Sequence, residues 1–179
     1  MFVSAPVIRT DRLILKPMCT KYLNSTHAYA SDVENCRLML FLPNESLEDT
    51  FEYLKDAETE AAKDNPSYYE LAVFLGEIHI GAVSLYISDK RDSAEIGWVF
   101  HRQYHGHGYA SEAAVGLLKF AADELEISSF IAHCDSENIA SRRVMEKIGM
   151  KLAGEYGGRR NKMSSEERRE CMYVLTIQK

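Results

Sequence analysis

The feature that most constrains this chain is a glycine-containing loop between a strand pattern and a helix pattern. Residues 94–100 alternate, with the even-numbered positions apolar, as in a strand with one buried face. The loop His105-Gly106-His107-Gly108 follows, and apolar residues then recur at helical spacing from 110 to 121. The first N–H groups of such a helix lack internal partners, so the junction predicts a phosphate or pyrophosphate site.

Three kinds of phosphate-binding loop compete for this segment. A Walker loop requires Gly-Lys followed by Ser or Thr, and that pattern is absent here. A dinucleotide fingerprint needs a third glycine where Ser111 stands, and it normally lies early in a parallel sheet. The third kind is a loop that binds the pyrophosphate of coenzyme A.

The rest of the chain alternates between strand and helix patterns. A weaker helical region covers 19–40, and Ser46 is placed to cap a clearer helix that ends before Pro66. Another helix pattern ends at Gly149. Strands are expected at 12–17, 69–75, 78–86, 94–100, 130–134, 152–156 and 172–177, the second and third joined as a hairpin by Gly76-Glu77. This order predicts an α/β fold of the α+β type, with helices on a largely antiparallel sheet.

Composition narrows the class of protein. A chain of 179 residues suits one domain, and its net charge of −6 argues against nucleic-acid binding. No stretch approaches the ~20 apolar residues of a membrane helix, and residues 1–6 do not resemble a secretory signal. Four cysteines without a zinc pattern predict reduced thiols. We therefore expect a cytoplasmic protein that does not bind a membrane.

Several segments in one order carry a family resemblance. Gln103-x-x-Gly106-x-Gly108 matches the [Q/R]-x-x-G-x-[G/A] signature of the GCN5-related N-acetyltransferase (GNAT) superfamily. The chain from about 8 to 177 resembles the ribosomal-protein alanine N-acetyltransferase (RimJ/RimL-like) branch, on the segments Thr10–Leu15, Glu95–Trp98, Gly106–Ala113, Asn138–Ser141 and Glu146–Met150. The resemblance implies one GNAT domain over 1–179, with about seven strands, flanking helices and splayed central strands.

The resemblance also implies acetyl-CoA as co-substrate. Backbone N–H groups of about 105–110 would hold the pyrophosphate, and the pantetheine arm would enter between 98–100 and 130–134. Asn138 would bond the pantetheine, although its position suits a helix N-cap equally and both roles can hold. The implied cofactor-binding residues are Trp98, Val99, Phe100, Gln103, His105, Gly106, His107, Gly108, Tyr109, Ala110, Asn138 and Ser141.

The implied reaction is direct transfer of acetyl to a primary amine, which must lose a proton before it attacks. Many superfamily members carry a tyrosine seven residues after the asparagine, where this chain has Met145. Ser141 is the nearest substitute as a donor to the leaving sulfur, with helix capping as its other reading. Glu95 is the candidate base through a water, or else a plain solvated carboxylate; His79 and His133 are weaker alternatives.

No metal site is expected. His101, His105 and His107 lie close in sequence but lack a zinc-binding pattern, and the rings of the last two are expected to turn outward. Two other functions compete with transfer: a non-catalytic acyl-CoA-binding sensor or scaffold, and a nucleotide-dependent oxidoreductase.

The acceptor is not identified by the sequence, which leaves a protein N-terminus, a polyamine, an antibiotic or a metabolite open. Its site is expected between the first helices and the last hairpin, where Tyr156, Tyr173 and 157–160 could shape it. Residues 45–64 carry eight acids and two lysines; this acidic helix either borders the site or is a solvated face. A homodimer could form, but no residue indicates one.

Overall fold

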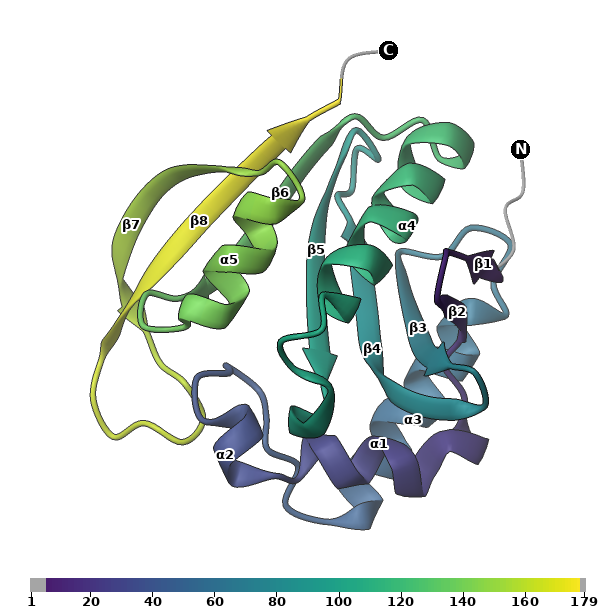
Figure 1. Cartoon of the computed structure of the whole chain (residues 1–179), viewed down its shortest axis with the longest axis horizontal. Helices are drawn as coiled ribbons and strands as arrows, with labels where there is room; N and C mark the ends of the chain where they lie inside the picture. The colour runs from purple at the N-terminus through teal and green to yellow at the C-terminus, as the bar shows by residue number, and fades with distance from the viewer. Residues whose placement is uncertain (1–5, 178–179) are drawn as a thin grey trace.

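Eight strands form one open sheet in the computed structural model, which describes residues 6–177 (Figure 1). The strand order is β1-β2-β3-β4-β5-β6-β8-β7, and every neighbouring pair is antiparallel except β5 and β6. The bounds are β1 Ile8–Arg9, β2 Leu13–Pro17, β3 Tyr68–Leu75, β4 Ile78–Ile87, β5 Ser93–Phe100, β6 Ser129–Asp135, β7 Lys151–Arg159 and β8 Arg168–Thr176. The predicted fold class is confirmed, and β1 is the strand that the sequence reading missed. The expected absence of a signal concerned residues 1–6, of which 1–5 lie outside the described part.

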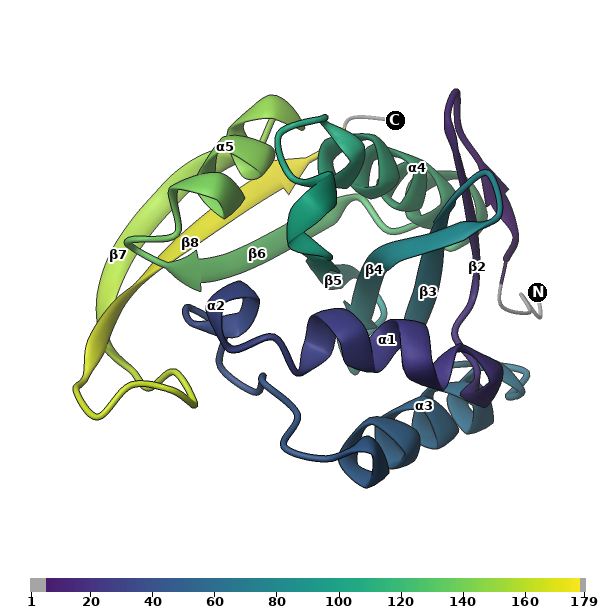
Figure 2. The same ribbon diagram turned by 60° about the horizontal axis from the view of Figure 1, so that its bottom comes forward.

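Helices cover both faces of the sheet (Figure 2). On one face, α4 (Tyr109–Glu124) and α5 (Ile139–Lys147) pack on the larger apolar core, which includes Ile96 and Phe100 of β5. On the other face, α1 (Leu23–Ala30) and α3 (Leu47–Ala61) enclose a smaller core with Ala72 and Phe74. The alternation predicted for β5 is therefore real, and it assigns the odd-numbered side chains to the face of α1 and α3.

Local signals determine where the helices begin and end. Ser46 and Asp49 form a reciprocal capping box at the start of α3. Gly149 has φ +88° just after α5, a conformation that favours glycine. The weak helical region 19–40 is a 3-10 turn (Thr20–Tyr22), α1 and a four-residue α2 (Val33–Cys36), which starts where the Asp32 side chain caps it.

The central strands β5 and β6 separate after a short stretch of pairing. Their register includes only Ser93–Ser129, Ala94–Phe130 and Glu95–Ile131, whereas β6 continues alongside β8 as far as Asp135. Figure 1 shows the two ribbons diverging below this point. The splay expected from the resemblance is therefore present, and it begins at Glu95.

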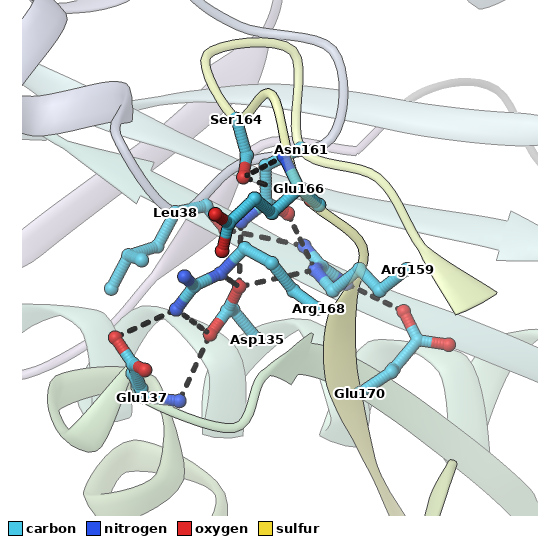
Figure 3. A network of polar contacts seen from close by, with 9 residues as sticks. All are labelled: Leu38, Asp135, Glu137, Arg159, Asn161, Ser164, Glu166, Arg168 and Glu170. Carbon is cyan, nitrogen blue, oxygen red and sulfur yellow. Dashed lines mark hydrogen bonds and ion pairs between the residues drawn. The ribbon is translucent and has the colours of Figure 1, made fainter. Parts of the chain in front are cut away.

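A buried polar network connects the end of β6, on one side of the split, to the hairpin of β7 and β8 (Figure 3). Asp135, fully buried at the end of β6, accepts hydrogen bonds from Arg168 and from Asn161 Nδ2, the latter at 2.6 Å. Burial alone would raise the pKa of Asp135, but the Arg168 and Glu137 N–H donors outweigh it and hold the pKa below its usual value. The carboxylate is therefore ionised and fully bonded.

The same network reaches the segment between α2 and α3. Arg159, 8% exposed, donates to Asn161 Oδ1 at 2.7 Å, to Glu170 Oε1 at 2.5 Å and to the Leu38 carbonyl at 3.2 Å. The Lys162 N–H donates to the Met39 carbonyl at 3.2 Å. These bonds join the β7–β8 loop to residues 38 and 39, and so fix one wall of the site described below.

Replacing Asp135 by alanine is expected to lower the free energy of unfolding by about 3 kcal/mol, because it removes the acceptor of the buried Asn161 amide and breaks an ion pair of the partly buried Arg168. Urea unfolding measures the change. The exposed Asp89→Ala, which removes the same charge from a loop, should change it by less than about 0.5 kcal/mol. Equal effects of the two substitutions would show that the network contributes nothing to stability.

Candidate active site

The loop before α4 presents a run of unpaired backbone amides. Gly106 and Gly108 both have φ +79°, a left-handed conformation that glycine adopts without strain. The first amide of the helix with an internal partner belongs to Glu112, which donates to Gly108 O at 3.1 Å. No acceptor among residues 6–177 meets the amides of 106–111. The helix dipole adds partial positive charge here, so the loop is built to hold an anion.

One boundary of the predicted loop needs correction. The His105 N–H donates to Arg102 O at 3.0 Å and closes the 3-10 turn Arg102–Tyr104. This amide is therefore not available to a phosphate, and the anion-binding run starts at Gly106. Gln103, which the signature includes, and His107, which stands at a variable position within it, line neither of the two cavities described below.

Residues from the beginning of the chain hold this loop in place. Glu112 accepts a hydrogen bond from Thr10 Oγ1 at 2.6 Å and forms an ion pair with Arg12, whose Nε lies 2.6 Å from the carboxylate. Arg12 also donates to the His107 carbonyl at 3.1 Å and lies over the Tyr109 ring. The segment Thr10–Leu15 thus adjoins the loop in space, which the sequence alone does not show.

Basic side chains flank the same loop. A side chain at Gly108 would begin 3.2 Å from Lys147 Nζ and 3.7 Å from an Arg12 nitrogen. The two cations come from α5 and from the β1–β2 connection. Arg12 is already paired with Glu112, and both side chains lie close enough to the loop to add positive charge beside the amides. Neither was singled out by the sequence reading, because nothing local to them indicates the contact.

The histidine rings near the loop serve structural hydrogen bonds. The His105 ring turns back and its Nε2 donates to Phe100 O at 2.9 Å, so the expected outward orientation is wrong for this residue. His107 Nδ1 donates to His105 O at 2.8 Å, and its exposed ring stacks on Tyr109. Among residues 6–177, no group of three or more side chains is arranged to hold a metal ion.

Two cavities meet where β5 and β6 separate. The smaller, about 340 Å³, lies beside the loop and includes Gly106, Gly108 and Tyr109 in its lining. The larger, about 740 Å³, lies on the face of α1 and α3. Five residues line both: Met39, Trp98, Val99, Asn138 and Ser141. The predicted cofactor residues on β5 and α5 are therefore brought together at the junction.

The backbone of β5 presents free groups to this junction. The His101 N–H donates to Ile80 O at 2.9 Å, so odd-numbered residues of β5 direct their backbone groups to β4. Trp98 and Phe100 consequently direct theirs toward the split, where β6 no longer pairs with them, although the Phe100 carbonyl already accepts from His105 Nε2. Val99 differs, because its backbone groups face β4 and only its side chain can line the junction of the two cavities.

Asn138 performs the capping role that its position suggested. Its Oδ1 accepts from the Ser141 N–H at 3.0 Å and starts α5. Both residues are half-buried and line the junction, and capping uses only Asn138 Oδ1, so Asn138 Nδ2 and the Ser141 hydroxyl have no other hydrogen-bond partner among residues 6–177. Met145, at the position where the family resemblance implied a tyrosine, is buried.

Glu95 lies at the last paired position before the split. Its Oε1 is 3.0 Å from His133 Nδ1, on the strand across the split, and both side chains line the larger cavity. Glu95 is 45% exposed and His133 22%, so water reaches the pair. From the sequence, Glu95 and His133 are alternative candidates for the general base. In the structure the two side chains form a hydrogen-bonded pair.

His79 belongs to the core instead. Its Nδ1 accepts from Ser25 Oγ at 2.8 Å, and its Nε2 donates to Gly81 O at 2.9 Å. Burial lowers the pKa of His79 to about 4. It lines neither cavity, so it is a neutral packing residue.

A buried carboxyl in the larger cavity was missed. Glu70 of β3 is 7% exposed and accepts from Tyr86 Oη at 2.6 Å and from Tyr53 Oη at 2.9 Å. Burial raises the pKa of Glu70 to about 7, against the opposing effect of the two hydrogen bonds. The available signal was a single acid inside the apolar run Tyr69–Leu75.

The remaining walls correct the expected acceptor region. They come from α1 and the segment 38–42, whereas the last hairpin supplies only Arg159. Tyr156 is half-exposed outside the cavity, and the Tyr173 hydroxyl bonds Arg142 and Glu146. The helix α3 contributes Tyr53, while none of the acids in 45–64 lines the cavity. The solvated-face reading of those acids is therefore the better one.

Comparison with known proteins gives a family match over most of the chain. The acetyltransferase (GNAT) domain family matches residues 12–151. The uncharacterised N-acetyltransferase YnaD of Bacillus subtilis (strain 168) is 33% identical over 147 residues, which is 82% of this chain and 84% of that protein.

Solved structures share the fold. A GNAT-family acetyltransferase from Bacillus anthracis superposes with a TM-score of 0.81 at 28% identity, over 96% of this chain and 98% of its own. RimL, a ribosomal L7/L12 α-N-protein acetyltransferase in complex with coenzyme A, has a TM-score of 0.86 at 18% identity, over 96% and 98% of the two chains. Separately, no helix within 6–177 is both long and apolar enough to cross a bilayer.

The raised pKa of Glu70 has a consequence for stability. The folded protein holds the proton up to about pH 7, whereas the unfolded chain releases it near 4.5, so the contribution of this group to stability falls as pH rises between those values. Relative to Glu70→Gln, the wild type should lose about 3 kcal/mol of unfolding free energy from pH 4 to pH 8. Urea unfolding of both proteins across this range tests it; parallel curves would contradict the assignment.

Proposed function

The chain belongs to the GNAT acetyltransferase family and is an acetyl-CoA-dependent N-acetyltransferase, and we propose that its reaction takes place where the two cavities meet. The smaller cavity, with its amide-rich loop, is the cofactor side, and the larger cavity is the acceptor side. The acceptor in this proposal is a primary amine, which enters past α1 and the segment 38–42.

One observation carries this proposal. Trp98 and Ser141 face both cavities at the place where β5 and β6 stop pairing, so a group delivered from one side meets a group delivered from the other. A direct transfer needs both reactants in one place, and holding them there removes much of the entropic barrier.

On the cofactor side, the amides of 106–111 would hold the pyrophosphate, with Arg12 and Lys147 close enough to share its charge. The pantetheine arm would lie in the split and pair with the backbone N–H and C=O of Trp98 and with the N–H of Phe100, as an added strand does. A free N–H there would also stabilise the oxyanion that forms when the thioester carbonyl is attacked.

On the acceptor side, Glu95 and His133 would prepare the amine. An ammonium cannot attack, so it must first lose a proton. The Glu95 carboxylate can take that proton directly or through water, and His133 at 3.0 Å holds the carboxylate in place. The amine nitrogen then forms its bond to the carbonyl carbon, and the carbon–sulfur bond breaks.

Ser141 is proposed to assist the departing sulfur. Ser141 lines both cavities, and its backbone N–H is held by Asn138 at 3.0 Å. A hydroxyl stabilises a thiolate by donating a hydrogen bond, although it is a weak proton donor. In this proposal Ser141 takes the role of the tyrosine that the family resemblance implies at the position of Met145.

The proposal extends to the whole chain as a single GNAT domain that needs no metal. Four free cysteines are compatible with a reducing compartment, so we place the protein in the cytoplasm. The possible homodimer and the absence of nucleic-acid binding stay predictions from the sequence.

Gly106→Trp tests the anion loop. The position is open, and an indole there would cover the amides, so affinity for coenzyme A should fall at least about tenfold. Isothermal titration calorimetry measures the affinity. Gly76→Trp is the matched control, because Gly76 also has a positive φ and open surroundings but lies in the β3–β4 turn. Unchanged affinity in Gly106→Trp would remove the loop from the cofactor site.

Glu95→Gln tests the proposed base. Removing the proton acceptor should lower kcat about 100-fold, while affinity for coenzyme A stays unchanged. A thiol-release assay with acetyl-CoA and a panel of primary amines reports the rate. The exposed Glu77→Gln controls for loss of charge. A Glu95→Gln enzyme at full rate would mean that another group, or solvent, takes the proton.

A further inference from the structure

Glu70 is a buried carboxyl that the proposed reaction does not use. It lies on β3, two strands away from the split, and forms part of the wall of the larger cavity. Tyr53 of α3 and Tyr86 of β4 each donate a hydroxyl hydrogen bond to a different carboxyl oxygen. Two different elements, α3 and β4, thus hold a group that lines the cavity.

The carboxyl has no cationic partner in the described structure. Among residues 6–177, no Lys, Arg or His nitrogen lies within 4.0 Å of it, although the other buried acids, Glu60 and Asp135, each have one. Burying an unpaired carboxylate is costly, and a cation that arrives beside it recovers much of that cost. A cavity with such a wall favours a ligand that carries a positive charge.

Sheet register places Glu70 relative to the reaction junction. Glu70 pairs with Ser84 of β4, and Ser84 pairs with Gly97 of β5, so the three lie in one row across the floor of the cavity. Adjacent strands are about 4.8 Å apart, which puts the Glu70 and Gly97 backbones about 10 Å apart. The missing side chain of Gly97, whose Cβ would lie 2.9 Å from Ser84 Oγ, keeps this row open.

We propose that Glu70, with Tyr53 and Tyr86, binds a second ammonium group of the acceptor, so that the acceptors are compact diamines or polyamines. The inference rests on the proposed function, because it takes the reacting amine to lie at the junction near Glu95. One end of the acceptor reacts there, while its other end lies along the Glu70–Ser84–Gly97 row and ends at the carboxylate.

The environments of the two acids suit these different tasks. Glu95 is half-exposed, hydrogen-bonded to His133 and adjacent to the split, where a proton must leave. Glu70 is enclosed and held at both oxygens, which suits a fixed binding position. An ammonium ion at Glu70 would favour its ionised form, so binding should expel the proton that the carboxyl carries when the site is empty.

The test compares α,ω-diaminoalkanes with monoamines of the same chain length as acceptors in the thiol-release assay. The wild type should prefer the diamine, and Glu70→Gln should lower the diamine-to-monoamine ratio of kcat/KM about tenfold, because the amide lacks the charge. Glu77→Gln, an equal change of charge in the exposed β3–β4 turn, should leave the ratio as in the wild type.

A second measurement uses only the wild type. With coenzyme A bound, diamine binding near pH 7 should release protons, which calorimetry detects as a binding enthalpy that depends on the buffer. The monoamine should release fewer. This readout keeps the inference testable if Glu70→Gln does not fold.

The inference is overturned if the wild type shows no preference for diamines, or if Glu70→Gln slows both amines equally, which would make the residue part of the reaction or of the fold. It also fails if proton release is the same for both amines. Failure of the proposed function looks different: the wild type would then bind no coenzyme A, or would release no thiol with any amine.

Discussion

The site depends on the early end of one strand pairing, that of β5 with β6, which are the only parallel neighbours among the strands of residues 6–177. Each strand edge that β5 and β6 present after Glu95 and Ile131 carries unpaired backbone groups. Such groups need partners, and a cofactor arm laid between the strands can supply them. The split is stable because each strand keeps its other neighbour, β4 for β5 and β8 for β6, and because the Asp135 network fixes the end of β6.

The site is assembled from segments that lie far apart in the chain, and polar contacts hold these segments in place. Thr10 and Arg12 hold the amide loop through Glu112, and Arg159 holds the acceptor-side segment through the Leu38 carbonyl. Both attachments use buried or partly buried charges whose bonds are satisfied, and this arrangement favours one geometry over many. The two cavities therefore meet at a defined place rather than in a flexible gap.

The acids of this chain illustrate how burial decides the role of a side chain. The acids of the stretch 45–64 are mostly solvent-exposed and line neither cavity, so they have little influence on the site beyond their general field. Glu70, alone in an apolar strand, is the acid whose environment changes its pKa most plainly toward neutrality. Glu95 lies between these extremes, close to solvent and to His133.

By itself the sequence determined the fold class, the order along the chain of every strand except β1, the helix caps and the amide loop, because all of these follow from local periodicity and from glycine or serine at special positions. Tertiary structure alone decided that the His105 amide is closed off, that Glu95 meets His133, and that Arg12 reaches the loop. It also decided that Glu70 faces a cavity. These facts depend on which strands become neighbours and in what register, and pairing between distant segments leaves no local pattern in a single chain.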